Sequence, residues 1–145
     1  MRAIQLLGRQ FVLGRNIGEA MGEADDARKQ QRQLRFSYDM LGEAALTEED
    51  AKRYLASYEQ AIHAIGKASH GRGIYEGPGI SIKLSALHPR YSRAQAERVM
   101  AELLPRVKAL ALLARQYDIG LNIDAEEADR LELSLDLLES LALDP

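Results

Sequence analysis

The chain has 145 residues, of which 46% are hydrophobic and 28% are charged, a composition typical of a globular protein and not of a disordered one. A net charge of −3 gives no strong attraction to nucleic acid or to an anionic membrane surface, so no nucleic-acid partner is expected for this segment. Cysteine is absent, which excludes disulfides, thiolate chemistry and cysteine metal sites.

Sequence patterns also argue against a metal site and against a membrane-spanning or secreted protein. The three histidines, His63, His70 and His88, are poorly spaced for one metal site on a helix, so we expect no metal. No run reaches the roughly 18 apolar residues of a membrane-spanning helix, and the N-terminal residues lack the apolar core of a signal peptide. These patterns predict a cytoplasmic protein.

Residues 1–34 are predicted to form a helical region. An apolar-periodic stretch runs from about Arg2 to Val12, breaks near Gly14, and is followed by a polar helix from Ala20 to Gln33. The next region, residues 35–145, has a different pattern, in which short apolar runs alternate with longer helical segments.

The first strand is predicted at about residues 35–40, followed by a helix. Thr47 provides a hydroxyl N-cap and acidic residues fill the first helical turn, while apolar residues recur every three or four positions up to Ile65. Gly71 is a candidate C-terminal stop. Residues 71–79 contain four glycines and a proline, which predicts an irregular connection. We reject a phosphate-binding loop there, because no Gly-Lys-Ser/Thr follows and the segment leads into a strand.

The second and third strands are predicted at residues 80–83 and 121–124. Between them, residues 92–95 fit a capping box, and a helix runs to about Tyr117 with a kink or break expected at Pro105. The leucine-rich stretch after Glu127 favours a helix, although the alternation at its start also fits a strand. Connections of this length imply parallel strands with right-handed crossovers.

Each predicted strand ends on a charged residue: Asp39, Lys83 and Asp124, at spacings of 44 and 41 residues. In a β/α barrel, catalytic and binding side chains lie where the parallel strands end. Because a complete barrel takes about 250 residues, we predict an α/β chain that holds the first three βα units of a (β/α)8 TIM-like barrel, preceded by helices. The alternative is that each charge only caps its strand or meets water.

The residue types suggest roles at these strand ends. The Lys83 ammonium suits an anionic substrate group, and an ion pair with Asp39 or Asp124 is the compatible alternative. Asp124 would need a raised pKa to act as a general base. The small Ala125 would let a flat ligand approach the backbone, and Glu43 is either a surface acid or the partner of a cation elsewhere.

Longer strings add a resemblance. Residues 36–47, 61–69, 71–93 and 117–127, which include Gly79-Ile-Ser-Ile-Lys-Leu-Ser-Ala-Leu-His-Pro-Arg90, resemble the proline dehydrogenase domain of bacterial proline utilization A. The similarity covers nearly everything from Arg35 onward, and residues before Arg35 resemble the helical region preceding the barrel more loosely. Strings of this length are far more specific than a short motif.

The resemblance implies an FAD-dependent enzyme that oxidises L-proline to Δ1-pyrroline-5-carboxylate and passes electrons to a quinone at the membrane surface. By similarity, Lys83 binds the proline carboxylate, Asp124 lies near substrate and flavin, and Ala125 contacts FAD. Asp39 lines the substrate pocket, and Glu43 pairs with a substrate-binding arginine that gates the site. A homo-oligomeric parent enzyme that is cytoplasmic or peripheral on the inner face of the cytoplasmic membrane is also implied.

The family's carboxylate-binding arginines and active-site tyrosines are not found in these 145 residues. We therefore expect the chain on its own to be inactive. Because three parallel strands leave two unpaired edges, we also expect it to self-associate or to stay partly unfolded. Two alternatives stay open at this point: a flavin-free β/α barrel acting on a small carboxylic acid, and a non-catalytic helical interaction module.

Overall fold

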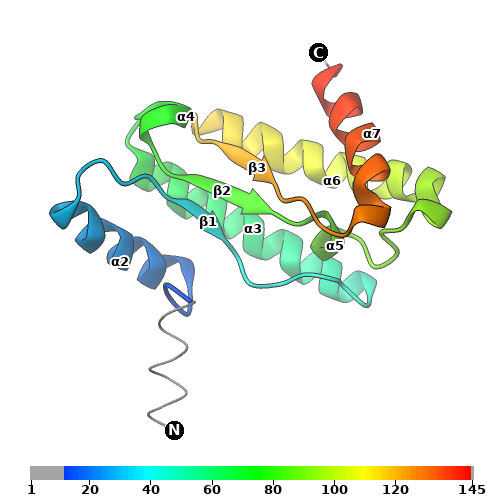
Figure 1. The fold of residues 1–145 in the computed structure, drawn as a ribbon, viewed down its shortest axis with the longest axis horizontal. Coiled ribbons are helices and arrows are strands. Elements are labelled where there is room, and N and C mark those ends of the chain that lie inside the picture. The colour runs from blue at the N-terminus through cyan, green and yellow to red at the C-terminus, as the bar shows by residue number, and fades with distance from the viewer. Residues whose placement is uncertain (1–11, 145) are drawn as a thin grey trace, which may run out of the picture.

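The computed structural model describes residues 12–144, and the apolar stretch expected from Arg2 lies outside them except for Val12. The elements follow the order expected for repeated βα units (Figure 1). They are α2 (Ile17–Gln30), β1 (Ser37–Asp39), α3 (Glu48–Ser69), α4 (Gly73–Glu76), β2 (Gly79–Ile82), α5 (Leu84–Leu87), η1 (Arg93–Gln95), α6 (Ala96–Gln116), β3 (Leu121–Ile123), η2 (Ala128–Arg130) and α7 (Leu131–Ala142).

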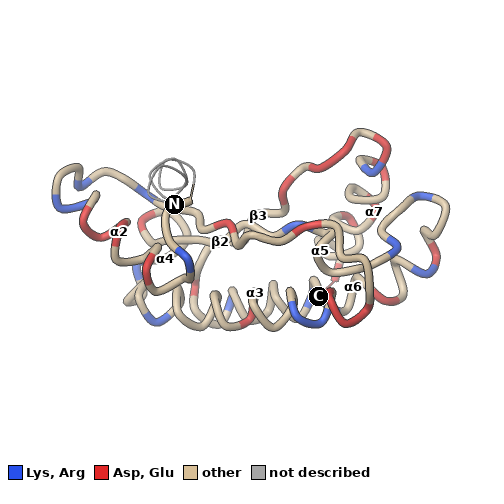
Figure 2. The backbone as a smooth tube through the Cα atoms, turned by 90° about the horizontal axis from the view of Figure 1, so that it is seen from below, with Lys and Arg blue, Asp and Glu red and all other residues tan. Residues whose placement is uncertain are grey.

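The three strands form a parallel sheet, as the sequence pattern predicted, and their order is β1-β2-β3. Ser37 pairs with Gly79, and Ile80 pairs with Leu121, so the strands end at the same edge of the sheet. Figure 2 shows that α3 and α6 lie on one side of this sheet. Their position on one side leaves two different sheet faces, one covered by helices and one open.

The covered face holds the hydrophobic core. Alternate strand residues point into it, because successive side chains of a strand face opposite ways. The fully or nearly buried residues on the strands and the facing helices are Tyr38, Ile80, Ile82, Tyr58, Ile62, Ile65, Val99, Leu103, Val107, Leu110, Leu133 and Leu137. Burial of this apolar set fixes the helices against the sheet and thereby positions the strand ends.

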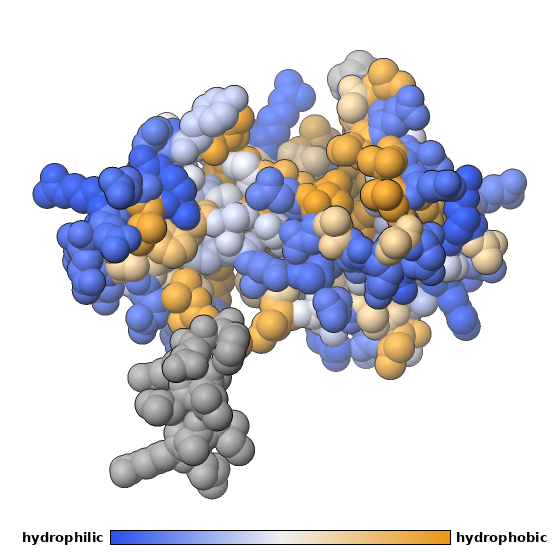
Figure 3. Space-filling model, in the orientation of Figure 1, coloured by the Kyte–Doolittle hydropathy of each residue, from blue (hydrophilic) through white to orange (hydrophobic). Residues whose placement is uncertain are grey.

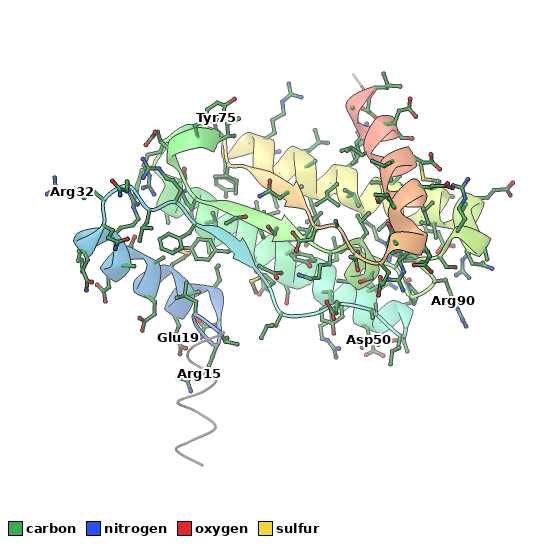
Figure 4. The ribbon with its side chains drawn as sticks, viewed as in Figure 1. Arg15, Glu19, Arg32, Asp50, Tyr75 and Arg90 are labelled. Carbon is green, nitrogen blue, oxygen red and sulfur yellow. The ribbon has the colours of Figure 1, made fainter. Side chains whose placement is uncertain are left out.

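Helix α3 begins as predicted. The Thr47 hydroxyl accepts a hydrogen bond from the Asp50 N–H at 3.0 Å, and the Asp50 carboxylate accepts one from the Thr47 N–H at 3.1 Å. Figure 4 labels Asp50 at this end of the helix. This reciprocal pair is a capping box, in which two otherwise unpaired N–H groups find acceptors. The hydrogen bond from the Thr47 hydroxyl also helps to lower the pKa of Asp50.

Two local predictions near the end of α3 need refinement. Helix α3 ends at Ser69, and the first left-handed residue is His70, with φ 51°, followed by Gly71, with φ 70°. Residues 71–79 are not wholly irregular, because α4 forms one turn in which the Gly77 N–H donates to the Gly73 carbonyl at 2.9 Å. That turn is also tied to the chain before β1 by an ion pair between Glu76 and Arg35.

The predicted capping box at residues 92–95 does not form. The Ser92 side chain makes no capping hydrogen bond, and the Gln95 N–H instead donates to the Ser92 carbonyl at 3.0 Å, which closes the 3₁₀ turn η1. Helix α6 starts only at Ala96 and continues through Pro105 to Gln116, so Pro105 does not break it.

Helix α7 settles the ambiguity of the leucine-rich stretch in favour of a helix. Leu133 and Leu137 are buried, while Leu131, Leu135 and Leu138 are about half exposed. Apolar side chains gather over α7 in the space-filling view (Figure 3). None of the helices within residues 12–144 is long and apolar enough to cross a lipid bilayer.

Candidate active site

The charged ends of the three strands meet in one cluster. The Lys83 ammonium lies between two carboxylates, with its Nζ 2.7 Å from Asp39 Oδ2 and 3.0 Å from Asp124 Oδ2. The order β1-β2-β3 accounts for this arrangement, because it puts the lysine strand in the middle. The ion pair that the sequence left as one possibility is therefore present with both acids.

The two carboxylates keep Lys83 charged. Its side chain is only 18% exposed, and burial alone would lower its pKa. The hydrogen bonds to Asp39 and Asp124, together with their negative charges, outweigh burial and raise the pKa of Lys83 well above its usual value. Lys83 is thus a fixed cation and not a general base at neutral pH.

The backbone at this strand end is also fixed. The Lys83 N–H donates to the hydroxyl of Tyr58 on α3 at 3.0 Å, and the Asp124 N–H donates to the Ile82 carbonyl at 2.9 Å. Tyr58 is buried, and burial is the main cause that raises its pKa. These bonds hold the lysine strand against the helix behind it and the aspartate strand beside it.

A second polar row lies on the same open face, one step back along the strands. Ser37 and Ser81 share a hydrogen bond of 3.1 Å between their hydroxyls, and the Asn122 amide donates to the Ser37 hydroxyl at 3.1 Å. Hydrophilic residues cross the centre of the molecule on this side (Figure 3). The sequence analysis missed this row, although its signal was present: each member lies two residues before a charged strand end.

Glu43 and Ala125 lie in the loops that follow β1 and β3, and the structure does not bring Glu43 into the charged cluster. Glu43 is exposed and forms no ion pair within residues 12–144. Ala125 is exposed directly after Asp124. The loop before Glu43 is tightly shaped, because Gly42 has φ 143° and a Cβ there would lie 2.3 Å from the Tyr54 ring.

The cluster suits a ligand that carries both charges. An ammonium has three N–H donors, and the aspartates occupy two of those of Lys83, which leaves one for an incoming carboxylate. The aspartate oxygens can in turn accept a hydrogen bond from an amine of the same ligand. Across the part of the chain that the structure describes, no group of three histidines or acids is arranged to hold a metal ion.

Comparison with known proteins decides the family. The model of the proline dehydrogenase family matches residues 22–145. The chain belongs to the proline dehydrogenase family. The match includes all three charged strand ends and the loops that hold Glu43 and Ala125.

The relatives are bifunctional PutA proteins. The chain is 70% identical over 143 residues to bifunctional protein PutA of Klebsiella aerogenes and 69% identical over 143 residues to that of Escherichia coli, covering 99% of this chain in each case. It spans 11% of the length of these relatives. The resemblance to proline utilization A stated from the sequence is therefore confirmed.

Solved structures agree on the fold. Proline utilization A from Bradyrhizobium japonicum matches with a TM-score of 0.80 and 46% identity, over 99% of this chain and 14% of that chain. The enzyme from Bdellovibrio bacteriovorus, inactivated by N-propargylglycine, matches with a TM-score of 0.88 over 99% of this chain and 16% of that chain. At 23% identity the second match speaks for the fold alone.

Proposed function

We propose that this chain forms part of the substrate site of a flavin-dependent proline dehydrogenase, which oxidises L-proline to Δ1-pyrroline-5-carboxylate and passes the electrons to a quinone at the membrane surface. The observation that carries the proposal is the position of Lys83 between Asp39 and Asp124. Proline is a zwitterion at neutral pH, so it presents a carboxylate to the lysine and an amine to the acids.

In this proposal Lys83 binds the proline carboxylate through its remaining N–H. Asp124 lies beside the substrate and the flavin, and Asp39 lines the substrate pocket, in keeping with its hydrogen bond to Lys83. Asp39 and Asp124 also aim the Lys83 side chain, because each accepts one of its hydrogen bonds. A preorganised charge of this kind orients substrate without a cost of rearrangement at the moment of reaction.

The residues present fit a bound flavin. Ala125 is exposed at the end of β3 and has only a methyl side chain, so a flat ring system can reach its backbone. When bound, FAD supplies the acceptor for the hydride that leaves the ring carbon beside the proline nitrogen. The exposed Glu43 is then available to pair with a substrate-binding arginine elsewhere in the enzyme and so to gate the site.

The fold proposal extends the sheet at both edges. We propose that residues 35–145 are the first three units of a (β/α)8 barrel and that the described part of residues 1–34, which holds α2, belongs to a helical region before it. The outer edges of β1 and β3 have no strand partner among the described residues, which leaves backbone groups for strands of the remaining barrel. The open polar face then becomes the barrel interior. We also propose that the whole enzyme is a homo-oligomer.

A chimera tests the function. The segment replaces its counterpart in the PutA protein of Escherichia coli, and proline-dependent dye reduction and flavin absorbance are measured. The segment should support both. Lys83→Ala should lower kcat/KM for proline by roughly 10- to 150-fold, because one charge-assisted hydrogen bond contributes ~1.5–3 kcal/mol.

The matched control is Lys52→Ala, which removes an exposed lysine from α3 and should leave kcat/KM unchanged. Flavin content must stay equal across the variants. A folded, flavin-loaded Lys83→Ala chimera whose kcat/KM stays within a factor of two would contradict the assignment. A chimera that folds but lacks the flavin absorbance would instead contradict the assignment of FAD as the cofactor.

A further inference from the structure

Ser85 lies two residues after Lys83, on α5, in the segment that follows β2. It forms hydrogen bonds to the loops that follow the other two strands. It is 3% exposed. Its hydroxyl accepts a hydrogen bond from the Ala44 N–H at 3.0 Å, and its carbonyl accepts one from the Ala45 N–H at 2.9 Å. Its own N–H donates to Glu126 Oε1 at 3.1 Å. One buried residue therefore bonds to the loop after β1 and to the loop after β3.

The loop after β1, residues 40–47, needs such an anchor. Ala44 has φ 49°, in the left-handed region that residues with a Cβ adopt only at a cost. Gly42, with φ 143°, bends the chain just before it. Because this conformation is not one the loop would hold by itself, the two bonds to Ser85 stabilise it. Glu43 lies between these two positions, so their backbone conformations set the path of the chain at Glu43.

The loop after β3 is held on both sides of Ala125. The preceding residue, Asp124, is bonded through its N–H to Ile82 and through its carboxylate to Lys83. The following residue, Glu126, has a side chain only 11% exposed, and its carboxylate bonds to Ser85. Ala125 is itself exposed, so its backbone is accessible to solvent between two anchored neighbours.

Glu126 also has a cation nearby. Arg130 lies one turn further along, with its Nη1 3.8 Å from Glu126 Oε2, and the same guanidinium packs over the Tyr91 ring. The same Nη1 lies 3.0 Å from Glu127 Oε2, so the Arg130 charge is shared between the two carboxylates and only partly offsets the charge of Glu126.

We propose that Ser85 and Glu126 are positioning residues, which set the loops of Glu43 and Ala125 relative to Lys83. Neither residue touches the charged cluster, and each acts through backbone N–H groups. The effect on proline rests on the proposed function. The effect on loop order does not, because it follows from the hydrogen bonds alone.

The test uses the Escherichia coli chimera and two readouts: deuterium uptake of the peptides covering residues 40–47 and 124–127, and KM against kcat for proline. Ser85→Ala removes only the hydroxyl acceptor. It should speed exchange in residues 40–47 by about 2- to 10-fold, the range for one hydrogen bond, with residues 124–127 unchanged. KM should rise by a similar factor and kcat should change less.

A pair of variants at Glu126 separates the hydrogen bond from the charge. Glu126→Gln keeps an oxygen acceptor for the Ser85 N–H, so it should retain slow exchange and the original KM. Glu126→Ala removes the acceptor and should speed exchange in residues 124–127. Ser140→Ala, which removes a hydroxyl that bonds only within α7, is the control that should change neither readout.

Unchanged exchange of residues 40–47 in a folded Ser85→Ala chimera would overturn the proposal for that loop. Equal behaviour of Glu126→Gln and Glu126→Ala would overturn it for the other loop. Should Ser85→Ala fail to fold, the Glu126 pair still decides whether the anchor exists. If the chimera with the unchanged segment does not oxidise proline, the proposed function fails, whereas the exchange measurements still test the anchor.

Discussion

The two faces of the sheet are built by the same three strands and differ in almost every physical property. Toward α3 and α6 the strands present Tyr38, Ile80 and Ile82, all buried. Toward the open side, the alternate positions carry hydroxyl, amide and charged groups, which bond to each other across the strands.

Stability and chemistry are thus separated onto opposite faces of one short sheet. Because side chains alternate along a strand, the neighbours Ile82 and Lys83 face opposite sides of the sheet. Ile82 is held by apolar burial, and Lys83 is held by hydrogen bonds and charge. The apolar face is fixed by burial, and its residues contribute by filling space. The polar face depends instead on directional interactions, because each of its groups needs a partner at hydrogen-bond distance.

The largest expected effect comes from leaving the open face and the sheet edges without neighbours. The 145-residue chain expressed alone should self-associate or stay partly unfolded, because β1 and β3 each have one outer edge with no partner among the described residues and Leu131, Leu135 and Leu138 are about half exposed. Size-exclusion chromatography with light scattering checks this. A monodisperse monomer with a sharp thermal transition would contradict this prediction, because it would show that the segment closes its own hydrophobic core without pairing its strand edges.

Ile82→Ala tests the covered face in the chimera. It should destabilise the fold by about 2–5 kcal/mol, because a fully buried side chain is replaced by a cavity. The melting temperature should fall, while KM for proline, measured well below it, should stay close to that of the parent chimera. A large rise in KM with an unchanged melting temperature would break the separation between the two faces.

Asn122→Ala tests the polar row of the open face. It removes one exposed hydrogen bond to Ser37, so we expect a loss of about 0.5–1.5 kcal/mol or less. The melting temperature of the chimera should change far less than with Ile82→Ala. A loss as large as that of the isoleucine would mean that this row supports the fold as strongly as the core does.

The smallest expected effect is the pH dependence of the Lys83 contribution. Because folding raises the pKa of Lys83, its stabilising contribution is complete below the unfolded value of about 10.4 and is lost only as pH rises through the higher folded value. The ratio of kcat/KM between the parent chimera and Lys83→Met should therefore be constant from about pH 6.5 to about pH 9. A ratio that falls across this range would show that the lysine loses its proton there.

Local sequence signals predicted the fold well where the interaction is local. The Thr47 cap, the three strands and the strand-end charges were predicted because spacing and residue type determine them. The Ser92 cap was wrong, because a backbone bond from Gln95 closes that turn. The turn α4 was missed because glycines mask a single helical turn.

The candidate site was predictable in part for the same reason. An ion pair of Lys83 with Asp39 or Asp124 was predicted as compatible with substrate binding, and the strand order, which puts the lysine strand in the middle, explains why both pairs form. The anchoring role of Ser85 depends on loops that lie about 40 residues away in the chain, on either side, and no periodicity in the sequence encodes such contacts. The assignments of Glu43 and Ala125 to arginine pairing and flavin contact stay predictions.

Gly66 shows how one absent side chain constrains a distant position. It lies within α3, where a Cβ would be 2.2 Å from Cγ of Tyr117, the residue after α6. A side chain at position 66 would therefore require the Tyr117 side chain to move. Among relatives that keep an aromatic residue at position 117 we expect glycine at position 66, and a larger residue at 66 should coincide with a smaller one at 117, a covariation that an alignment can reveal.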